Sequence, residues 1–101
     1  MEIRTKSADG VASIILGGRF DFNVNRDFKM AYDPFLSQRE VRILEIVFGN
    51  VEFIDSSALG MLLVLRDKAQ AAGKSVKLVQ TRDLIRQVLE IAHFERFFEI
   101  T

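Results

Sequence analysis

The sequence contains no cysteine, and it has only one proline and one histidine. Without cysteine the chain forms no disulfide, offers no thiolate to a metal and has no cysteine nucleophile. Because His93 is the only histidine, a metal site built from several histidines is also excluded. Neither sign of charge prevails, since 14 lysines and arginines balance 14 aspartates and glutamates to a formal net charge of zero. The scattered basic residues therefore indicate no surface for nucleic acid or for an anionic membrane.

The chain also lacks an apolar run of membrane-spanning length, and its first residues do not have the charged-then-apolar pattern of a signal peptide. No Gly-x-x-x-x-Gly-Lys phosphate loop is present, so nothing argues for a built-in kinase or NTPase. With 101 residues, 49% apolar and 28% charged, the chain has the size and balance of one globular domain. We therefore expect a single domain over residues 1–101, located in the cytoplasm.

Strand and helix patterns alternate along the chain after a short hairpin. Asp9-Gly10 is a two-residue hairpin signal, which predicts that the first two strands pair antiparallel. The segments expected to be strands are 1–7, 11–16, 41–48, 75–80 and 97–100. Helical periodicity marks residues of about 26–36, 56–72 and 84–92. Because strand–helix–strand crossovers place parallel strands in one sheet, we predict an α/β fold. It would have a mixed β-sheet, an N-terminal antiparallel hairpin and helices packed against the sheet.

Local signals set the expected element boundaries. Asn23 or Asn25 is placed to cap the first helix. Pro34 either kinks this helix or makes it restart with Asp33 as the new cap, because a residue before proline is pushed away from helical geometry. Gly49-Asn50 is expected to break the strand that precedes it.

The segment Phe53–Leu63 stands out because a strand pattern changes to a helix pattern within it. The apolar run ends at Ile54, and Asp55-Ser56-Ser57 occupies the start of the helix. In the simplest interpretation these polar residues only cap the helix. Alternatively, a serine at a helix N-terminus can become phosphoserine without dismantling the helix, because the partial positive charge there favours an anion. The added charge of about −1.5 to −2 would change what a partner meets, so such a serine is a candidate switch.

The first half of this helix is apolar around nearly its whole circumference. A helix of that kind is normally buried on most sides, and burial between the sheet and its neighbours is the expected outcome. The alternative leaves some of Leu59, Met61 and Leu62 exposed beside Ser56 as a docking patch, although exposed apolar patches are uncommon in monomers.

A serine at a strand-to-helix turn is also found in the nucleophile elbow of hydrolases. That elbow needs small residues on both sides, whereas Ser56 lies between Asp55 and Ser57. A catalytic triad would also depend on His93, with no other histidine in reserve. Asp21 and Asp55 could pair as carboxylates, but nothing else in the sequence resembles a sugar site. We therefore expect no catalytic activity.

The octapeptide Phe53-Ile54-Asp55-Ser56-Ser57-Ala58-Leu59-Gly60 resembles the Asp-Ser-Ser-Gly-Leu-Gly signature of STAS-domain anti-sigma-factor antagonists, small bacterial proteins of partner-switching pathways. Gly18-Arg19-Phe20-Asp21 is similar to the family's Gly-x-x-Asp after the second strand, and Ala72-Gly73-Lys74 to the turn after the signature helix. The pattern of residues 84–100 agrees as well, so the resemblance covers essentially the whole chain. Ala58 stands where the family usually has glycine, which should favour the helix by about 1 kcal/mol.

The resemblance implies a phosphorylation-controlled binding module in which the first signature serine, Ser56, is the phosphoacceptor. Unphosphorylated, it would bind an anti-sigma factor that is also a serine kinase and so release that factor's client. A PP2C-type serine phosphatase would remove the phosphate and restore the unphosphorylated, binding form. Asp21 and Asp55 would lie on the kinase-facing surface. The other residues expected at the partner surface are Ser57, Ala58, Leu59, Met61 and Leu62. No cofactor and no metal are implied.

Other outcomes of the same family stay open. The chain can instead be a STAS scaffold subunit in which Ser56 only caps the helix. It can also be a regulator of a non-sigma output, such as biofilm or motility control, with a partner that is not a kinase. Residues 22–38 carry more aromatics than the family implies, namely Phe22, Phe28, Tyr32 and Phe35. The oligomeric state is not fixed by the sequence, and a monomer is the expectation.

Overall fold

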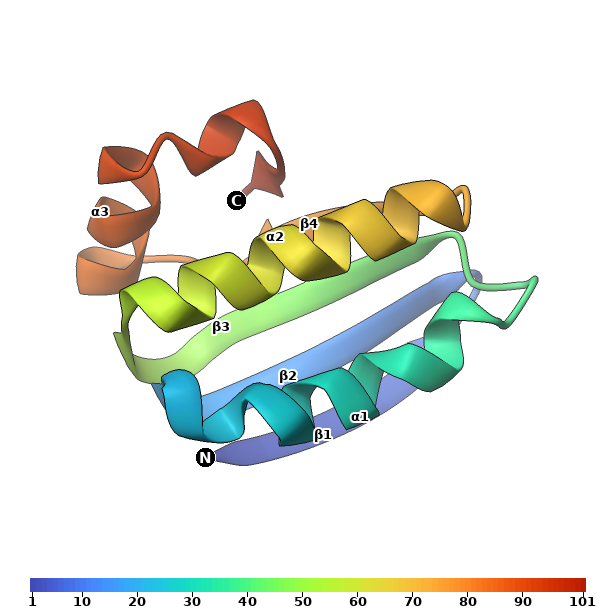
Figure 1. The fold of residues 1–101 in the computed structure, drawn as a ribbon, viewed down its shortest axis with the longest axis horizontal. Helices are drawn as coiled ribbons and strands as arrows, with labels where there is room; N and C mark the ends of the chain where they lie inside the picture. Colours follow the sequence, from blue (N-terminus) through green and yellow to red (C-terminus); the bar gives the residue numbers. More distant parts are fainter.

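The computed structural model describes residues 1–101 as one β-sheet with helices packed on it (Figure 1). The strands are β1 (Glu2–Ala8), β2 (Val11–Phe20), β3 (Ile43–Ile54), β4 (Ser75–Val79) and β5 (Glu99–Ile100). The α-helices are α1 (Asn25–Leu36), α2 (Ser56–Ala71) and α3 (Asp83–Ile91), and short 3₁₀ helices occupy Phe22–Val24 and Phe94–Arg96. None of the helices combines the length and the apolar character that crossing a membrane requires.

The five strands lie in the sheet in the order of the sequence, β1-β2-β3-β4-β5. β1 pairs antiparallel with β2, whereas the other neighbours pair parallel. Every step from β2 to β5 crosses the sheet in the same direction, so right-handed crossovers place α1, α2 and α3 on one face. Figure 1 shows α1 and α2 side by side in front of the strands. The predicted mixed sheet with an N-terminal hairpin is confirmed.

The hairpin turn has the backbone geometry that its sequence predicts. Asp9 and Gly10 have φ angles of 54° and 83°, so both central residues are in the left-handed region. Two such residues make the turn whose twist matches that of the flanking antiparallel strands, and Asp-Gly is among its preferred sequences. The turn places Ala8 opposite Val11, which sets the register of β1 on β2.

The core lies between the helices and the face of the sheet that they cover. Leu16, Leu44, Ile46 and Leu78 point into it from three neighbouring strands, and all are essentially inaccessible to solvent. Burying an aliphatic side chain of this size stabilises the fold by roughly 1.5–3 kcal/mol. The aromatic ring of Phe20 packs at 5.0 Å from that of Phe28 and 6.1 Å from that of Phe48, measured between ring centroids. This aromatic cluster fixes α1 against the end of β2 and the middle of β3.

The capping of α1 differs from the expectation, whereas its end at Leu36 agrees with it. Neither Asn23 nor Asn25 caps the helix, because the 3₁₀ turn leads directly into α1 and the N-cap position falls on Val24, which makes no side-chain cap bond. Of the two outcomes expected at Pro34, the restart with Asp33 as cap is wrong, since α1 continues through the proline to Leu36. Only two residues follow the proline, and buried Tyr32 and Phe35 on either side of it hold the last turn on the core. Packing thus offsets the backbone hydrogen bond that proline cannot donate.

Gly49-Asn50 does not break the strand, which runs on to Ile54. Ile15 lies opposite Val47, whereas Gly17 lies opposite Asn50, so Phe48 and Gly49 together face one residue of β2. This extra residue is a β-bulge, a feature that bends a strand without ending its pairing. Because β3 continues past the bulge, it stays paired with β2 as far as Phe20 and Ile54, where the two strands end together.

Candidate functional site

The candidate site lies where β2 and β3 end beside each other. Phe20 and Ile54 are paired neighbours in the parallel ladder, and the backbone N–H of Asp55 donates to the carbonyl of Phe20 at 3.3 Å. Asp21 and Asp55 therefore follow adjacent strand ends, as the Gly-x-x-Asp and Asp-Ser-Ser motifs require. The carboxyl edge of parallel strands is the usual place for a functional site in an α/β sheet.

Both aspartates are used to start a helix. Oδ1 of Asp55 accepts a hydrogen bond from the backbone N–H of Ala58 at 2.9 Å, which is the N-cap of α2. Its other oxygen, Oδ2, accepts from the N–H of Phe22 at 3.4 Å and so joins the two loops. Oδ1 of Asp21 accepts from the N–H of Asn23 at 3.0 Å, and Oδ2 lies 3.6 Å from Nε of Arg19. The two carboxylates are therefore structural parts of the site as well as its surface charge.

Ser56 is the first residue of α2, and it is exposed. Its hydroxyl takes no part in the cap, because the carboxylate of Asp55 fills that role. The interpretation in which Ser56 only caps the helix is therefore wrong. A serine held at this position by the backbone alone, with a free hydroxyl directed away from the core, is accessible to a modifying enzyme.

The residues expected at the partner surface divide into two groups. Ser57 is exposed and Leu59 is half-buried, so both can contribute to a surface beside Ser56. Ala58 and Leu62 have no exposed area, and Met61 retains 8%. The expectation of burial for the start of α2 is confirmed, and a docking patch that includes Met61 and Leu62 is wrong. These side chains face the sheet, so the folded chain offers them to no partner.

Phe22 is a surface residue of the site that the sequence did not single out. Its side chain is 70% exposed, and its backbone N–H donates to Asp55, so it lies directly against the start of α2. The other aromatics of this region, Phe28, Tyr32 and Phe35, are buried in the core. In the sequence, Phe22 differs from them because it comes one residue after the capping Asp21, before the helical pattern of α1 begins.

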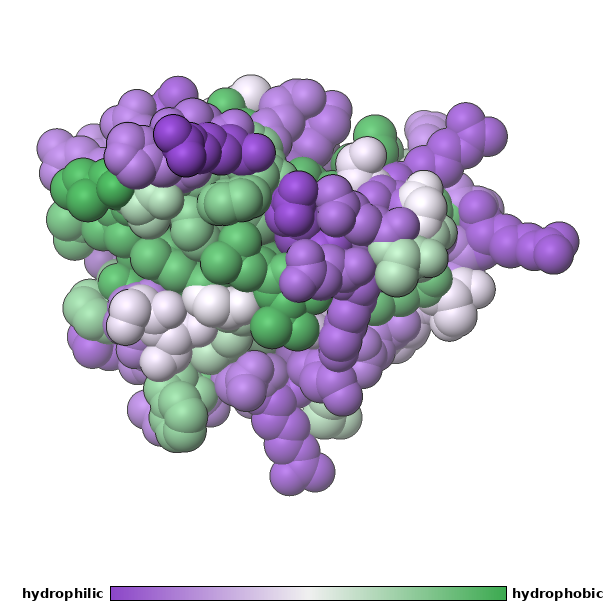
Figure 2. Space-filling view, turned by 45° about the horizontal axis from the view of Figure 1, so that its top comes forward, coloured by the Kyte–Doolittle hydropathy of each residue, from purple (hydrophilic) through white to green (hydrophobic).

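A further apolar surface extends from α2 toward α3. Leu84 and Ile91 of α3 are 54% and 79% exposed, and Val64 of α2 is also exposed. Figure 2 shows apolar side chains gathered at the end of the molecule that holds α3 and the first turns of α2. Exposed apolar area of this kind is typical of an interaction surface.

The hydrolase interpretation has no geometric support. Nδ1 of His93 lies 3.4 Å from the carboxylate of Glu95, and no hydrogen bond connects the imidazole to Ser56. His93 also follows α3, whereas Ser56 starts α2, so the two residues belong to different helices. Ser56 therefore has no histidine base in contact that could activate it as a nucleophile.

These features define a class: a small α/β domain whose parallel strands end at a free serine flanked by capping aspartates. The model of the STAS domain family matches residues 2–101, and the chain belongs to this family. The STAS-domain containing protein PA14_20770 of Pseudomonas aeruginosa (strain UCBPP-PA14) is 38% identical over 96 residues, which cover 94% of this chain and 93% of that protein.

Solved structures show the same fold. The anti-sigma factor antagonist SpoIIAA in its unphosphorylated form superposes with a TM-score of 0.77 at 18% identity, over 99% of this chain and 87% of the other. The phosphorylated form of SpoIIAA, a Bacillus cell fate determinant, gives a TM-score of 0.75 at 17% identity, over 99% and 91%. An anti-sigma factor antagonist from Mycobacterium paratuberculosis gives 0.85 at 18% identity, over 98% and 83%. The family assignment made from the Asp-Ser-Ser motif is confirmed.

Proposed function

We propose that this chain is an anti-sigma-factor antagonist: a cytoplasmic binding module, without catalysis of its own, that is switched by phosphorylation of Ser56. The observation that carries the proposal is the free, exposed hydroxyl of Ser56 at a helix start that Asp55 already caps. The similarity to a protein solved in both unphosphorylated and phosphorylated forms supports the same assignment.

The fold can tolerate a phosphate at this position. The first N–H groups of a helix lack partners within the helix, and together with its dipole they favour an anion by about 0.3–1 kcal/mol. Because the Ser56 hydroxyl makes no bond within the chain, phosphorylation breaks none. The phosphorylated chain therefore keeps its structure, and the switch acts on the surface.

The same phosphate opposes a partner packed on this surface. Phosphorylation adds about −1.5 to −2 charges beside the carboxylates of Asp21 and Asp55, which already make the surface acidic. A partner that covers Ser56 would have to desolvate this charge or supply cations to match it. Phe22 and Leu59 provide the apolar contact area around the serine in the unmodified form.

The proposed partner is an anti-sigma factor that is itself a serine kinase. It binds the unphosphorylated chain, phosphorylates Ser56 with its own ATP and then dissociates. A PP2C-type phosphatase removes the phosphate and resets the module. A regulator of a different output, for example biofilm or motility control, would use the same surface with another partner.

Three variants and a map of native phosphorylation test the proposal. Ser56→Ala should bind the partner constitutively in co-precipitation from native cells, and Ser56→Asp should lose binding. Ser75→Ala is the matched control, because Ser75 is an exposed serine beside the start of β3, at the other end of that strand from Ser56, and the variant should behave as the unmodified chain. Phosphopeptide mapping across growth and stress conditions should find one phosphate, on Ser56. Equal binding by all three variants, or phosphate on Ser57 alone, would contradict the proposal.

A further inference from the structure

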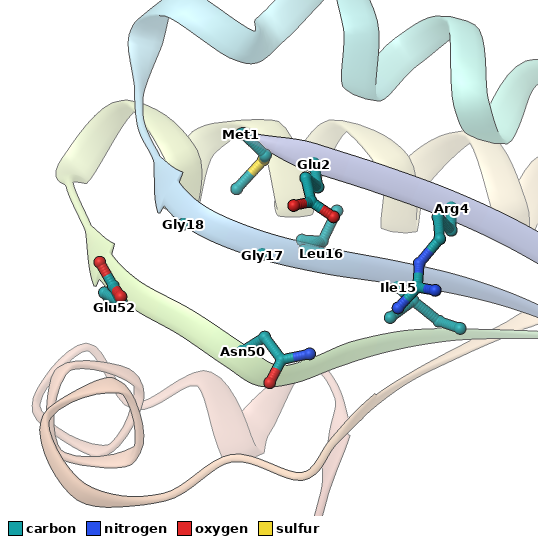
Figure 3. A pocket seen from close by; sticks show the side chains of 9 residues that line it. All are labelled: Met1, Glu2, Arg4, Ile15, Leu16, Gly17, Gly18, Asn50 and Glu52. Carbon is teal, nitrogen blue, oxygen red and sulfur yellow. The ribbon is translucent and has the colours of Figure 1, made fainter.

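The face of the sheet opposite the helices is uncovered. All three crossovers place their helices on the other side, and Figure 3 looks onto this open face, with α2 passing behind the strands. In that view the side chains of Glu2 and Arg4 on β1 and of Asn50 on β3 border a hollow of about 510 Å³ above Gly17. Parallel sheets usually carry helices on both faces, so a bare face needs an explanation.

A row of polar residues, one from each strand, crosses this face perpendicular to the strands. Lys6 pairs with Ser13, Ser13 with Glu45, Glu45 with Lys77, and Lys77 with Glu99, so one residue of each strand belongs to the row. Paired residues of neighbouring strands point to the same side of a sheet. From β3 to β5 the charges of the row alternate in sign.

Apolar residues flank this row on both sides. Side chains alternate between the faces of a strand, so residues two positions away share the open face. On one side lie Ile15, Val47 and Val79, which the register aligns, and on the other lie Val11 and Ile43. All five are only half-buried, although they are β-branched residues of the kind that normally pack between layers. The face thus has two apolar stripes separated by a charged stripe.

Glu45 is a charged member of the row that has no ion-pair partner. It is partly buried, and its one partner is the hydroxyl of Ser13, which donates to Oε1 at 3.3 Å. Its neighbour Lys77 is engaged with Glu99, with Nζ 3.4 Å from Oε2. No cation lies within ion-pair distance of Glu45.

We propose that a second copy of this chain covers the open face. A two-fold axis parallel to the strands and between β3 and β4 places Glu45 opposite Lys77 of the second copy, and Lys77 opposite its Glu45. The same axis places Val47 opposite Val79 of the second copy, so the apolar stripes of the two copies also meet. Sheets that pack face to face keep their strands within about 30° of each other, which this axis allows.

Other occupants and other axes fit less well. An axis along the polar row would place every residue opposite itself, and Lys6, Glu45 and Lys77 would all meet like charges. The neighbouring charges of Glu45 and Lys77 become complementary to themselves when their order is reversed by this axis, which points to a copy of the chain rather than to an unrelated partner. The longer dimensions of the chain, 34 and 27 Å, span this face. They are large enough to supply the roughly 800 Å² per partner of a stable interface. The proposal departs from the expectation of a monomer.

Sedimentation equilibrium of the full chain, from micromolar to millimolar concentration, tests the proposal. The average mass should rise from one chain to two. Glu45→Lys and Lys77→Glu should each raise the dissociation constant of the dimer by at least about tenfold, because symmetry places two like-charge contacts in the interface. The double variant Glu45→Lys with Lys77→Glu restores opposite charges and should return the constant to within about threefold of the unmodified value.

Two further variants keep the result decisive. Glu45→Gln retains an acceptor for Ser13 while removing the charge, so it should fold even if Glu45→Lys does not, and it should weaken the dimer. Ile91→Ser changes the exposed apolar surface of α3 on the opposite side and should leave association unchanged. A single-chain mass at every concentration would overturn the proposal. A dimer that is lost in Ile91→Ser, but that keeps its dissociation constant in the single variants Glu45→Gln and Lys77→Glu, would also overturn it.

Discussion

Replacing Asp55 by alanine separates the two roles that meet at the start of α2. The carboxylate of Asp55 makes the only side-chain cap of the helix, at 2.9 Å from the N–H of Ala58. Removing such a cap costs about 1 kcal/mol. The longer bond from Phe22, at 3.4 Å and on the surface, adds about 0.5 kcal/mol. We therefore expect Asp55→Ala to lower the free energy of unfolding by about 1.5 kcal/mol.

Ser56→Ala should have no comparable effect. The hydroxyl makes no cap bond, and alanine is a better helix former than serine, so the change should stay within about 0.5 kcal/mol. Asp55→Asn is the matched control, since asparagine caps a helix about as well as aspartate but carries no charge. It should retain most of the stability that Asp55→Ala loses.

Chemical and thermal denaturation of the four proteins measure these differences. A loss of about 1.5 kcal/mol corresponds to a fall in Tm of roughly 6–12 °C for a domain of this size. If Ser56→Ala destabilised the chain as much as Asp55→Ala, the cap in solution would be Ser56. The reasoning that leaves its hydroxyl free for phosphorylation would then be refuted.

Other substitutions distinguish the surface of the site from its support. Phe22→Ala removes a ring that is 70% exposed, so it should weaken partner binding in calorimetric titration while the unfolding free energy changes by less than about 0.5 kcal/mol. Leu62→Ala truncates a fully buried side chain and should cost about 2–5 kcal/mol in denaturation, and equal stability would show that the side chain is not in the core. Burial, and then the charge of Asp33, raise the pKa of Tyr32 above 10.0. Because the folded state favours the neutral phenol, its contribution to stability is complete below pH 10.0 and is lost as the pH rises through the folded pKa. Ultraviolet titration should therefore show Tyr32 ionising later in the folded chain than in urea, and coincident curves would contradict its burial.

The parts of the fold that sequence could predict are those that short-range chemistry decides. Asp9-Gly10 specifies a hairpin because both residues tolerate positive φ, and the turn alone sets the register of β1. The Asp-Ser-Ser junction marks the start of α2 because a capping residue and a change of period coincide there. These signals need no knowledge of the rest of the chain.

The parts that failed depend on contacts between distant residues. Pro34 stays inside α1 because buried Tyr32 and Phe35 hold the last turn, and that burial is decided by the sheet beneath. Gly49 sits in a bulge rather than at a strand end because its partner strand β2 continues beside it. The same holds for the site: the bond from the N–H of Phe22 to Asp55 depends on how two loops meet, which no local pattern encodes.

The two proposed surfaces lie on different sides of the molecule. Ser56 follows the end of β3 and starts a helix on the covered face, whereas Glu45 lies near the start of β3 on the open face. A dimer formed through the open faces would leave both copies of Ser56 exposed, because the helices would become its outer layers. Phosphorylation at one surface then adds charge far from the other, so the switch can release a partner without dissolving the dimer. Two partner sites on one rigid unit would also bind a dimeric partner more tightly than a single site, since the second contact is intramolecular. The bare face of the sheet would in this way set the strength of a signal that the proposed phosphorylation of Ser56 would turn on and off.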